Sequence, residues 1–288
     1  MIIIVGAGGQ IGSNVVRELE QKQLPIRIRA IVHKSAPVFS KSVEVMKTEL
    51  LNKEEVIEAF KGGSTIFLLT PERPDSNEIL EETKIIIENY KTAIKNAGAK
   101  KIVCLSCGGA QIEKNTGNIL MSRMLEQSFS DMEIEKIFVR PSYYYSNWLG
   151  YLDLMKNAGI LPTFFPADLK VEMHSPLDVA KFITKCILND KQSNETTIYE
   201  LGGEKYSTND IANSFSKKLN KEITVQVVPI EDRIQTLMSV GFTHNTAQNM
   251  SDMTQAVIDN VSHFEFEDKV IKLPTTFDDY LESVLKML

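Results

Sequence analysis

Glycines at a regular spacing follow the first apolar run of the chain. The segment reads Val5-Gly6-Ala7-Gly8-Gly9-Gln10-Ile11-Gly12, so Gly6, Gly9 and Gly12 lie three residues apart. In this pattern Gly6 permits a tight turn, Gly9 lets the backbone approach a pyrophosphate, and Gly12 lets the following helix pack closely on a sheet. The unpaired N–H groups at the start of such a helix attract phosphate oxygens. The pattern predicts a dinucleotide site, and a purely structural turn is the alternative.

The end of the second apolar run indicates which dinucleotide would bind. A carboxylate about 20 residues past the turn would bind the ribose hydroxyls of NAD. The sequence has no Asp or Glu between Glu20 and Glu44, whereas His33 and Lys34 follow directly after the apolar run. Positive charge without an acid at this position favours a 2′-phosphate. We therefore expect NADP(H) rather than NAD(H), the alternative being that these cations are only solvated at the surface.

These residues need a sheet and its helices to position them. Continuous apolar strands joined by amphipathic helices are typical of a parallel sheet that is covered on both faces. Right-handed crossovers then make a doubly wound α/β fold, the Rossmann fold, the leading topology. Apolar runs of strand length, with helical spacing between most of them, occur at residues 2–5, 26–32, 43–46, 65–69, 102–105 and 134–139.

The alternation of strands and helices loosens after about residue 150. We expect an NAD(P)-binding domain over residues 1–150, with residues 172–203 returning to it. A helix over residues 206–219, with Ser207 or Thr208 as its N-cap, belongs to the later part of the chain. Residues 151–171 and 204–288 are expected to form a small, mainly helical cap that completes the substrate side.

The composition is that of a globular protein and excludes several classes. The 288 residues carry a net charge of −6, with 43% hydrophobic and 24% charged residues, which excludes a disordered chain. The apolar start is expected to be a buried strand rather than a signal peptide. No run approaches the about 18 apolar residues that span a bilayer, and the mild acidity gives no concentrated positive face for nucleic acid.

The cysteines and histidines give no sign of a disulfide framework or a metal site. Three cysteines are an odd number for a long chain, so a reducing cytoplasm is the expected location. None of the four histidines forms a pair with the spacing of a zinc site, and we expect no metal.

Several segments, taken together with the glycine spacing, resemble the NmrA-like family of atypical short-chain dehydrogenases/reductases. The resemblance extends over essentially the whole chain, and the order of the segments is the same as in the family. The segments are Thr70-Pro71, residues 101–106, Arg140-Pro141-Ser142-Tyr143-Tyr144-Tyr145-Ser146-Asn147, residues 174–179 and residues 276–280.

The resemblance implies a row of cofactor contacts along one edge of the sheet. The family usually has an arginine where His33 stands, and a histidine is mostly neutral at pH 7 unless a phosphate favours its charged form. The implied contacts are Gly6, Gly9, Gln10 and Ile11 at the pyrophosphate, His33 and Lys34 at the 2′-phosphate, Leu50 near the adenine, Leu69 and Thr70 along the channel, and Ser106, Pro141 and Tyr143 towards the nicotinamide.

The chain departs from the superfamily in its acid–base residues. Related enzymes commonly use a tyrosine with a lysine four residues later, because the ammonium lowers the pKa of the phenol. None of the eight tyrosines here is followed by lysine at that spacing, and Asn118 stands where the tyrosine would be. In the matching helix the family often has a lysine four residues before a glutamate, whereas Ser122 here precedes Glu126. A nucleoside-diphosphate-sugar epimerase depends on that pair and is therefore disfavoured.

Two functions remain open. The first is an NADPH-dependent reductase of a small substrate such as a quinone, whose flat ring accepts a hydride readily; Ser106 and Tyr144 are its weak catalytic candidates. The second is a non-enzymatic NADP(H) sensor that binds a protein partner. The chain would be a monomer or a homodimer. The expected substrate contacts are Cys107, Tyr144, Tyr145, Asn147 and Trp148, although at least half of the aromatic side chains here are expected to pack in the core.

Overall fold

An eight-stranded parallel sheet organises the chain, for which a computed structural model describes residues 1–189 and 194–286. Its strand order is β13-β10-β6-β5-β4-β1-β2-β3, and every printed pairing in it is parallel. The strands are β1 (Ile2–Ile4), β2 (Ile28–Val32), β3 (Val43–Lys47), β4 (Thr65–Leu68), β5 (Lys101–Leu105), β6 (Glu135–Pro141), β10 (Thr196–Gly202) and β13 (Ile271–Lys272).

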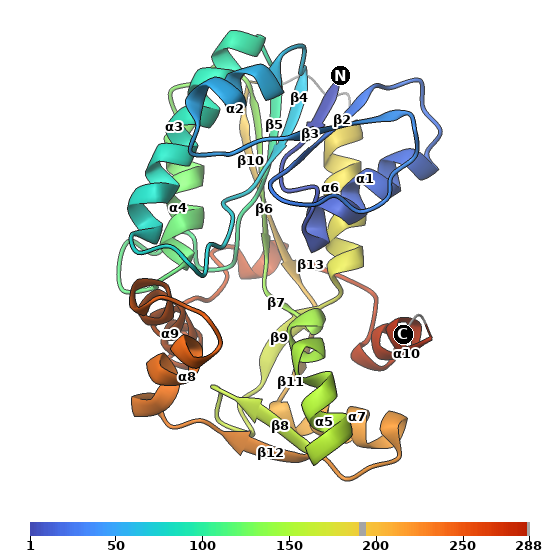
Figure 1. Ribbon diagram of the computed structural model, residues 1–288, viewed down its shortest axis with the longest axis vertical. Coiled ribbons are helices and arrows are strands. Elements are labelled where there is room, and N and C mark those ends of the chain that lie inside the picture. Colours follow the sequence, from blue (N-terminus) through green and yellow to red (C-terminus); the bar gives the residue numbers. More distant parts are fainter. Residues whose placement is uncertain (190–193, 287–288) are drawn as a thin grey trace.

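The order of the strands confirms the doubly wound Rossmann-type α/β fold. The chain runs outward from β1 to β2 and β3, then crosses back to β4 on the other side of β1 (Figure 1). Central strands such as Ile2–Ile4 are buried over their whole length, because helices cover both faces of the sheet. A crevice at the carboxyl ends of β1 and β4 is where such sheets bind ligands.

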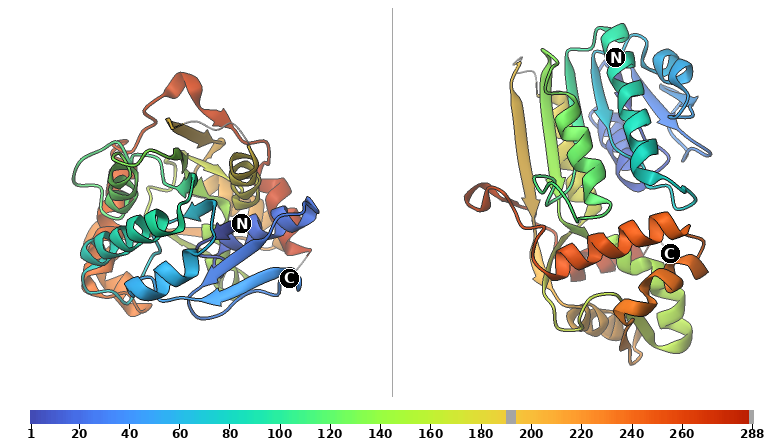
Figure 2. Two further views of the ribbon diagram at one scale, coloured as in Figure 1. Left: turned by 90° about the horizontal axis from the view of Figure 1, so that it is seen from above. Right: turned by 90° about the vertical axis from the view of Figure 1, so that its left-hand side faces the viewer.

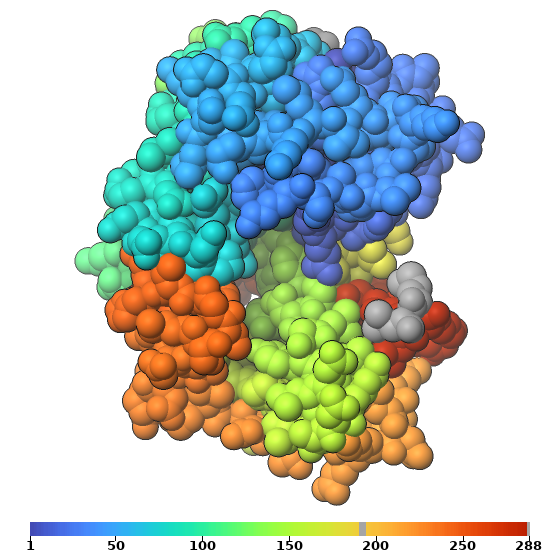
Figure 3. Space-filling model, in the orientation of Figure 1, coloured from blue at the N-terminus to red at the C-terminus, as the bar shows by residue number. Residues whose placement is uncertain are grey.

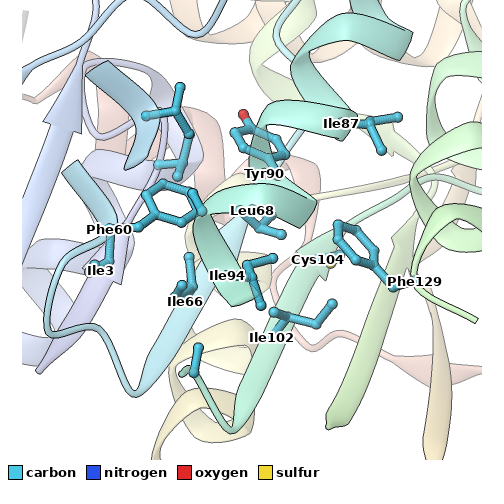
Figure 4. Packing of buried hydrophobic residues seen from close by; sticks show 14 of the residues in the cluster. Ile3, Phe60, Ile66, Leu68, Ile87, Tyr90, Ile94, Ile102, Cys104 and Phe129 are labelled. Atoms are coloured by element: carbon cyan, nitrogen blue, oxygen red, sulfur yellow. The ribbon is translucent and has the colours of Figure 1, made fainter. Parts of the chain in front are cut away.

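Helices α2 (Lys53–Phe60), α3 (Ile79–Ala97) and α4 (Ile119–Ser128) cover one face of the sheet. The helical spacing of apolar residues in α3 turns Ile87, Tyr90 and Ile94 towards the strands. There they pack against strand residues such as Ile66 and Ile102 (Figure 4). The helix ends at Gly98, whose positive φ of 64° suits a glycine.

Helices α1 (Gln10–Gln21) and α6 (Pro176–Leu188) pack side by side on the opposite face. Val15, Val16 and Leu19 of α1 share one cluster with Val179 and Ile183 of α6. The sheet therefore has a hydrophobic layer on each side, which holds its strand ends in fixed positions.

A smaller subdomain, the cap, lies beyond the carboxyl ends of the strands (Figures 1 and 2). Its own core contains Trp148, Phe215 and Phe277. Its helices are α5 (Leu152–Ala158), α7 (Thr208–Leu219), α8 (Arg233–Ser239), α9 (His244–Ile258) and α10 (Phe277–Leu285). Two small sheets accompany them, one with β7 (Tyr143–Tyr144), β9 (Val171–His174) and β11 (Glu204–Tyr206), and one with β8 (Ile160–Thr163) and β12 (Thr224–Val227).

Some details of the cap differ from the expectation. The two small sheets do not follow from the sequence pattern, because their strands span two to four residues and alternate irregularly in burial. Strand β13 lies within residues 204–288 but adds to the edge of the large sheet. Ser207 caps α7 as expected, since its hydroxyl accepts a hydrogen bond from the Asp210 N–H. Within the described ranges, no helix is long and apolar enough to cross a membrane.

Candidate functional site

A cavity of about 680 Å³ runs along the carboxyl edge of the sheet, between the strands and the cap. Its lining includes residues that lie one or two positions after six strands: Gly6 after β1, His33 after β2, Glu49 after β3, Leu69 after β4, Ser106 after β5 and Ser142 after β6. Met253 of α9 closes it from the cap. Figure 3 shows the surface hollowed between the blue segment and the green and orange segments.

The glycine turn leaves bare backbone at one part of this cavity. Gly6 has a φ of +69°, and a Cβ on Gly12 would lie 2.4 Å from the Gly6 carbonyl oxygen, so both positions require glycine. A Cβ on Gly9 would meet nothing closer than that oxygen at 3.4 Å. Gly9 is exposed, lines the cavity and gives α1 no side-chain cap. The first N–H groups of α1 therefore remain available to an anion.

The geometry of the glycine turn fits the binding of a dinucleotide. The packing within the protein explains Gly6 and Gly12, whereas Gly9 leaves room for a pyrophosphate to reach the backbone. Gln10 and Ile11 line the same part of the cavity, and the Gln10 side chain accepts a hydrogen bond from Ser146 of the cap at 2.9 Å. The residues present thus fit the phosphates of a nucleotide.

Charged residues surround the neighbouring part of the cavity, which we call the adenosine end. His33 Nε2 lies 3.1 Å from Glu49, and Arg73 Nη1 lies 3.3 Å from the same carboxylate. Burial of Glu49 opposes its ionisation, but the Leu51 N–H, Arg73 and His33 outweigh it and lower the pKa of Glu49. Lys34 is exposed at the rim of the cavity and has no ion-pair partner within residues 1–189 and 194–286.

The charges that follow the second strand in the sequence do not indicate Glu49 and Arg73. Glu49 follows β3 and Arg73 lies in the loop after β4, yet both line the cavity with His33. The topology of the sheet indicates these two residues, because all parallel strands end at the same edge and the loops that follow them lie together. Leu50, expected near the adenine, lines the cavity beside Glu49.

The opposite part of the cavity, the substrate end, holds Ser106, Cys107, Asn118 and Tyr144. The Tyr144 hydroxyl and the Asn118 side-chain oxygen are buried and have no hydrogen-bond partner among the residues that the structure describes. Burial raises the pKa of Cys107 to about 11, so its thiol keeps its proton at neutral pH. Buried polar atoms without partners are costly and point to a ligand that would satisfy them.

Ser106 connects the substrate end to a buried ion network. Its hydroxyl donates to Glu126 at 2.5 Å, and Glu126 accepts two further hydrogen bonds from Arg140 at 2.7 and 2.8 Å. Arg140 also donates to Glu265 at 2.6 Å. Because the Ser106 hydroxyl donates its hydrogen bond to Glu126, the lone pairs of its oxygen remain available to accept a hydrogen bond from a ligand in the cavity.

The aromatic segment after β6 divides between cavity and core. Of its expected contacts, Tyr144 and Pro141 line the cavity, whereas Tyr145 and Trp148 are almost fully buried in the core of the cap. Tyr143 packs on Trp148 and Phe165, with ring centroids 5.7 and 5.4 Å apart.

Neither Tyr143 nor Asn147, which is exposed, lies in the lining of the cavity. Their positions, like those of Tyr145 and Trp148, assign them to packing or to the surface. We therefore leave these four residues out of the proposed site. The remaining expected contacts all line the cavity: Gly6, Gly9, Gln10, Ile11, His33, Lys34, Leu50, Leu69, Thr70, Ser106, Cys107, Pro141 and Tyr144.

The loop after β4 is tied to the cap. Thr243 N–H and the Thr246 hydroxyl both donate to the Pro74 carbonyl, at 2.9 and 2.7 Å. The Asn245 side-chain oxygen accepts from the Ile79 N–H at 3.0 Å. These bonds fix the loop that carries Glu72 and Arg73 across the opening of the cavity.

Known proteins of similar sequence and structure share this architecture. NAD(P)H azoreductase of Xenophilus azovorans is 24% identical over 261 residues, which cover 88% of this chain and 86% of that protein. The crystal structure of NADPH-dependent quinone oxidoreductase 2 of Escherichia coli with NADPH superposes with a TM-score of 0.78 at 21% identity, over 99% of this chain and 100% of that one.

A nucleoside-diphosphate-sugar epimerase from Staphylococcus aureus superposes equally well, with a TM-score of 0.78 at 20% identity over 98% of this chain and 99% of that one. At such identities the structures show a shared fold alone. The model of the NmrA-like family, in contrast, matches residues 1–281 and so takes in both the sheet and the cap. The chain belongs to the NmrA-like family, as the order of its motifs predicts.

Proposed function

We propose that this protein is an NAD(P)H-dependent oxidoreductase that reduces a small, electron-poor substrate such as a quinone. The observation that carries the proposal is one continuous cavity. In one part of it the backbone at Gly9 is open to a phosphate, and at its substrate end two buried polar atoms have no hydrogen-bond partner among the described residues. The names of the relatives support it, because an azoreductase and a quinone oxidoreductase both transfer electrons from a nicotinamide to a conjugated acceptor.

NADPH is proposed as the preferred cofactor. Lys34 has no competing carboxylate among the described residues and lies at the rim beside His33. Arg73 and His33 together offset the charge of Glu49, which would otherwise repel a phosphate. The 2′-phosphate would then gain a charge-assisted contact with Lys34 that NADH cannot make.

The chain's own residues would bind, orient and shield the reacting groups. A bound reduced nicotinamide would supply the hydride. The first N–H groups of α1 would hold the pyrophosphate, and Ser106 would accept a hydrogen bond at the sheet edge while Glu126 keeps its hydroxyl oriented. The Tyr144 hydroxyl would donate a hydrogen bond to the substrate oxygen, because it has no hydrogen-bond partner within the described part of the chain.

The walls of the substrate end favour a flat, apolar molecule. Ile119, Met121 and Met253 line it together with the Tyr144 ring. Methionine side chains adapt to irregular shapes and contact aromatic rings favourably. A ring would therefore pack between these side chains with its carbonyl oxygen directed at Tyr144.

A non-enzymatic sensor is the second candidate, and the ion network favours it. Ser106 in the cavity connects through Glu126 and Arg140 to Glu265, which lies in an exposed segment between α9 and β13. A cofactor that moved Ser106 could alter this segment and its contacts with a protein partner. An epimerase is not proposed, because Asn118 stands where the tyrosine of the usual pair would be.

Calorimetric titration with NADPH, NADH, NADP⁺ and NAD⁺ tests the cofactor assignment. We expect micromolar binding of NADPH and clearly weaker binding of NADH. A quinone panel then tests turnover. Oxidation of bound NADPH by a quinone supports the reductase, whereas binding that differs strongly between NADPH and NADP⁺ without turnover supports the sensor. Absence of binding for all four nucleotides would overturn both candidates.

A further inference from the structure

Glu72 is an acidic residue of the cavity that has no role in the function proposed above. The chain lacks the usual tyrosine–lysine pair, so another group must supply the proton that a reduced quinone takes up. Glu72 lies in the loop after β4, is exposed to solvent, and belongs to the lining of the cavity. Hydrogen bonds from Thr243 and Thr246 of the cap to the Pro74 and Ser76 carbonyls hold this loop in position.

The loop that carries Glu72 follows β4, which pairs with β5 in the sheet, so it neighbours the loop after β5 that carries Cys107. A charge on Glu72 raises the pKa values of Cys107, Tyr143 and Tyr144, in addition to the larger effect of burial on each of them. Glu72, Cys107 and Tyr144 line the same cavity, in which the Tyr144 hydroxyl has no hydrogen-bond partner among the described residues. Cys107 lies in the loop after β5 and Tyr144 in β7, so both belong to the substrate end.

Among the residues that the structure describes, no cation forms an ion pair with Glu72. The adjacent Arg73 turns away, with its Nη1 3.3 Å from Glu49 and its Nε 2.8 Å from Glu82. The surrounding protein raises the pKa of Glu72 by desolvating its carboxylate. The carboxyl thus holds its proton to higher pH than an ordinary glutamate does.

We propose that Glu72 is the proton donor of the reductase: its carboxylic acid protonates the substrate oxygen while that oxygen accepts a hydrogen bond from Tyr144. The inference rests on the oxidoreductase function proposed above. For a quinone, the hydride brings two electrons and one hydrogen, and Glu72 supplies the second hydrogen as a proton to give the hydroquinone. The O–H bond of Glu72 breaks as that of the product forms, and solvent in the open cavity returns a proton to the carboxylate.

The first test measures the Glu72 carboxyl without any reaction. In the protein labelled with ¹³C at glutamate side-chain carboxyls, we expect one NMR signal that titrates above the ordinary glutamate range. Glu72→Gln removes that signal, and Glu78→Gln keeps it. Glu78 is a matched control because it is exposed, lies outside the cavity lining and makes no capping hydrogen bond. If every glutamate signal titrated in the ordinary range, the proposal would be overturned.

The second test compares two acceptors that differ in their need for a proton. A quinone needs one, whereas a cationic triarylmethane dye takes a hydride at carbon and becomes neutral without one. We expect Glu72→Gln to lower quinone turnover by about 100-fold, in the range of a lost general acid, and to change hydride transfer to the dye less than about threefold. Equal losses with both acceptors would show that Glu72 has only a structural role.

The pH profile adds a further comparison. Because the acid form is the active one, quinone turnover by the unmodified protein should fall as the pH rises through the pKa of Glu72, and Glu72→Gln should lack that fall. NADPH affinity should stay within about threefold in the variant, since Glu72 lies at the substrate end. Failure of the unmodified protein to bind NADPH would instead defeat the proposed function itself. Quinone turnover by Glu72→Gln equal to that of the unmodified protein at every pH would defeat only the assignment of Glu72.

Discussion

At the scale of single residues, Lys34 is the cation whose contribution to cofactor choice can be isolated. It is exposed at the rim of the cavity, and its loss disturbs no ion pair among the described residues. We expect Lys34→Ala to weaken NADPH binding about tenfold, which corresponds to about 1.4 kcal/mol, and to leave NADH binding unchanged. Lys41→Ala, an exposed charge outside the lining, is the control. Calorimetry decides, and an equal loss for both nucleotides would refute a 2′-phosphate contact.

His174 predicts a pH dependence of stability. It is fully buried, its two ring nitrogens have no hydrogen-bond partners in residues 1–189 and 194–286, and burial lowers its pKa from 6.5 to about 4. The unfolded chain therefore binds the proton first, and stability falls as the pH drops from 6.5 towards 4. The full loss is about 3 kcal/mol. Urea unfolding across this range should show the loss in the unmodified protein and in the exposed-site control His263→Phe, but not in His174→Phe.

At the scale of secondary-structure elements, the contact of β1 with α1 depends on Gly12. A Cβ there would lie 2.4 Å from the Gly6 carbonyl oxygen, a backbone atom that cannot move without shifting the turn. We expect Gly12→Ala to lower the free energy of unfolding by about 1–3 kcal/mol and to weaken NADPH binding. Gly150→Ala, where a Cβ would meet nothing within 4 Å, should leave both unchanged. Thermal unfolding and calorimetry measure the two effects; an unaltered Gly12→Ala would contradict the tight packing.

Elements also show how far the sequence alone leads. Continuous apolar runs and helical spacing predict the large sheet and its helices, because burial on both faces leaves a plain signal. The aromatic segment gives no such signal. Tyr144 lines the cavity while Tyr145 and Trp148 pack in the cap, and both environments select the same apolar rings. Glu49 and Glu72 lie in loops after strands, where only the path of the chain decides which side chains face the cavity.

At the scale of the whole molecule, Arg140 links the sheet to distant segments. Its guanidinium, in β6, contacts Glu126 of α4, Glu200 of β10 and Glu265 of the segment after α9. Removing the cation would leave buried carboxylates without compensation. We expect Arg140→Met to destabilise the protein by about 3–5 kcal/mol in urea unfolding, and a second change, Glu126→Gln, to recover part of the loss. A loss below about 1 kcal/mol would show that the network contributes little to stability.

The cavity between sheet and cap joins the proposed cofactor residues to the proposed substrate residues, and we propose that hydride transfer takes place inside it. The most direct measurement is an anaerobic single turnover with NADPH, or with NADPH deuterated at nicotinamide C4, and one equivalent of a quinone. We expect complete oxidation of the bound cofactor, slower with the deuterated form. Cofactor that stays bound and reduced in the presence of every quinone tested would contradict a reductase and leave the sensor.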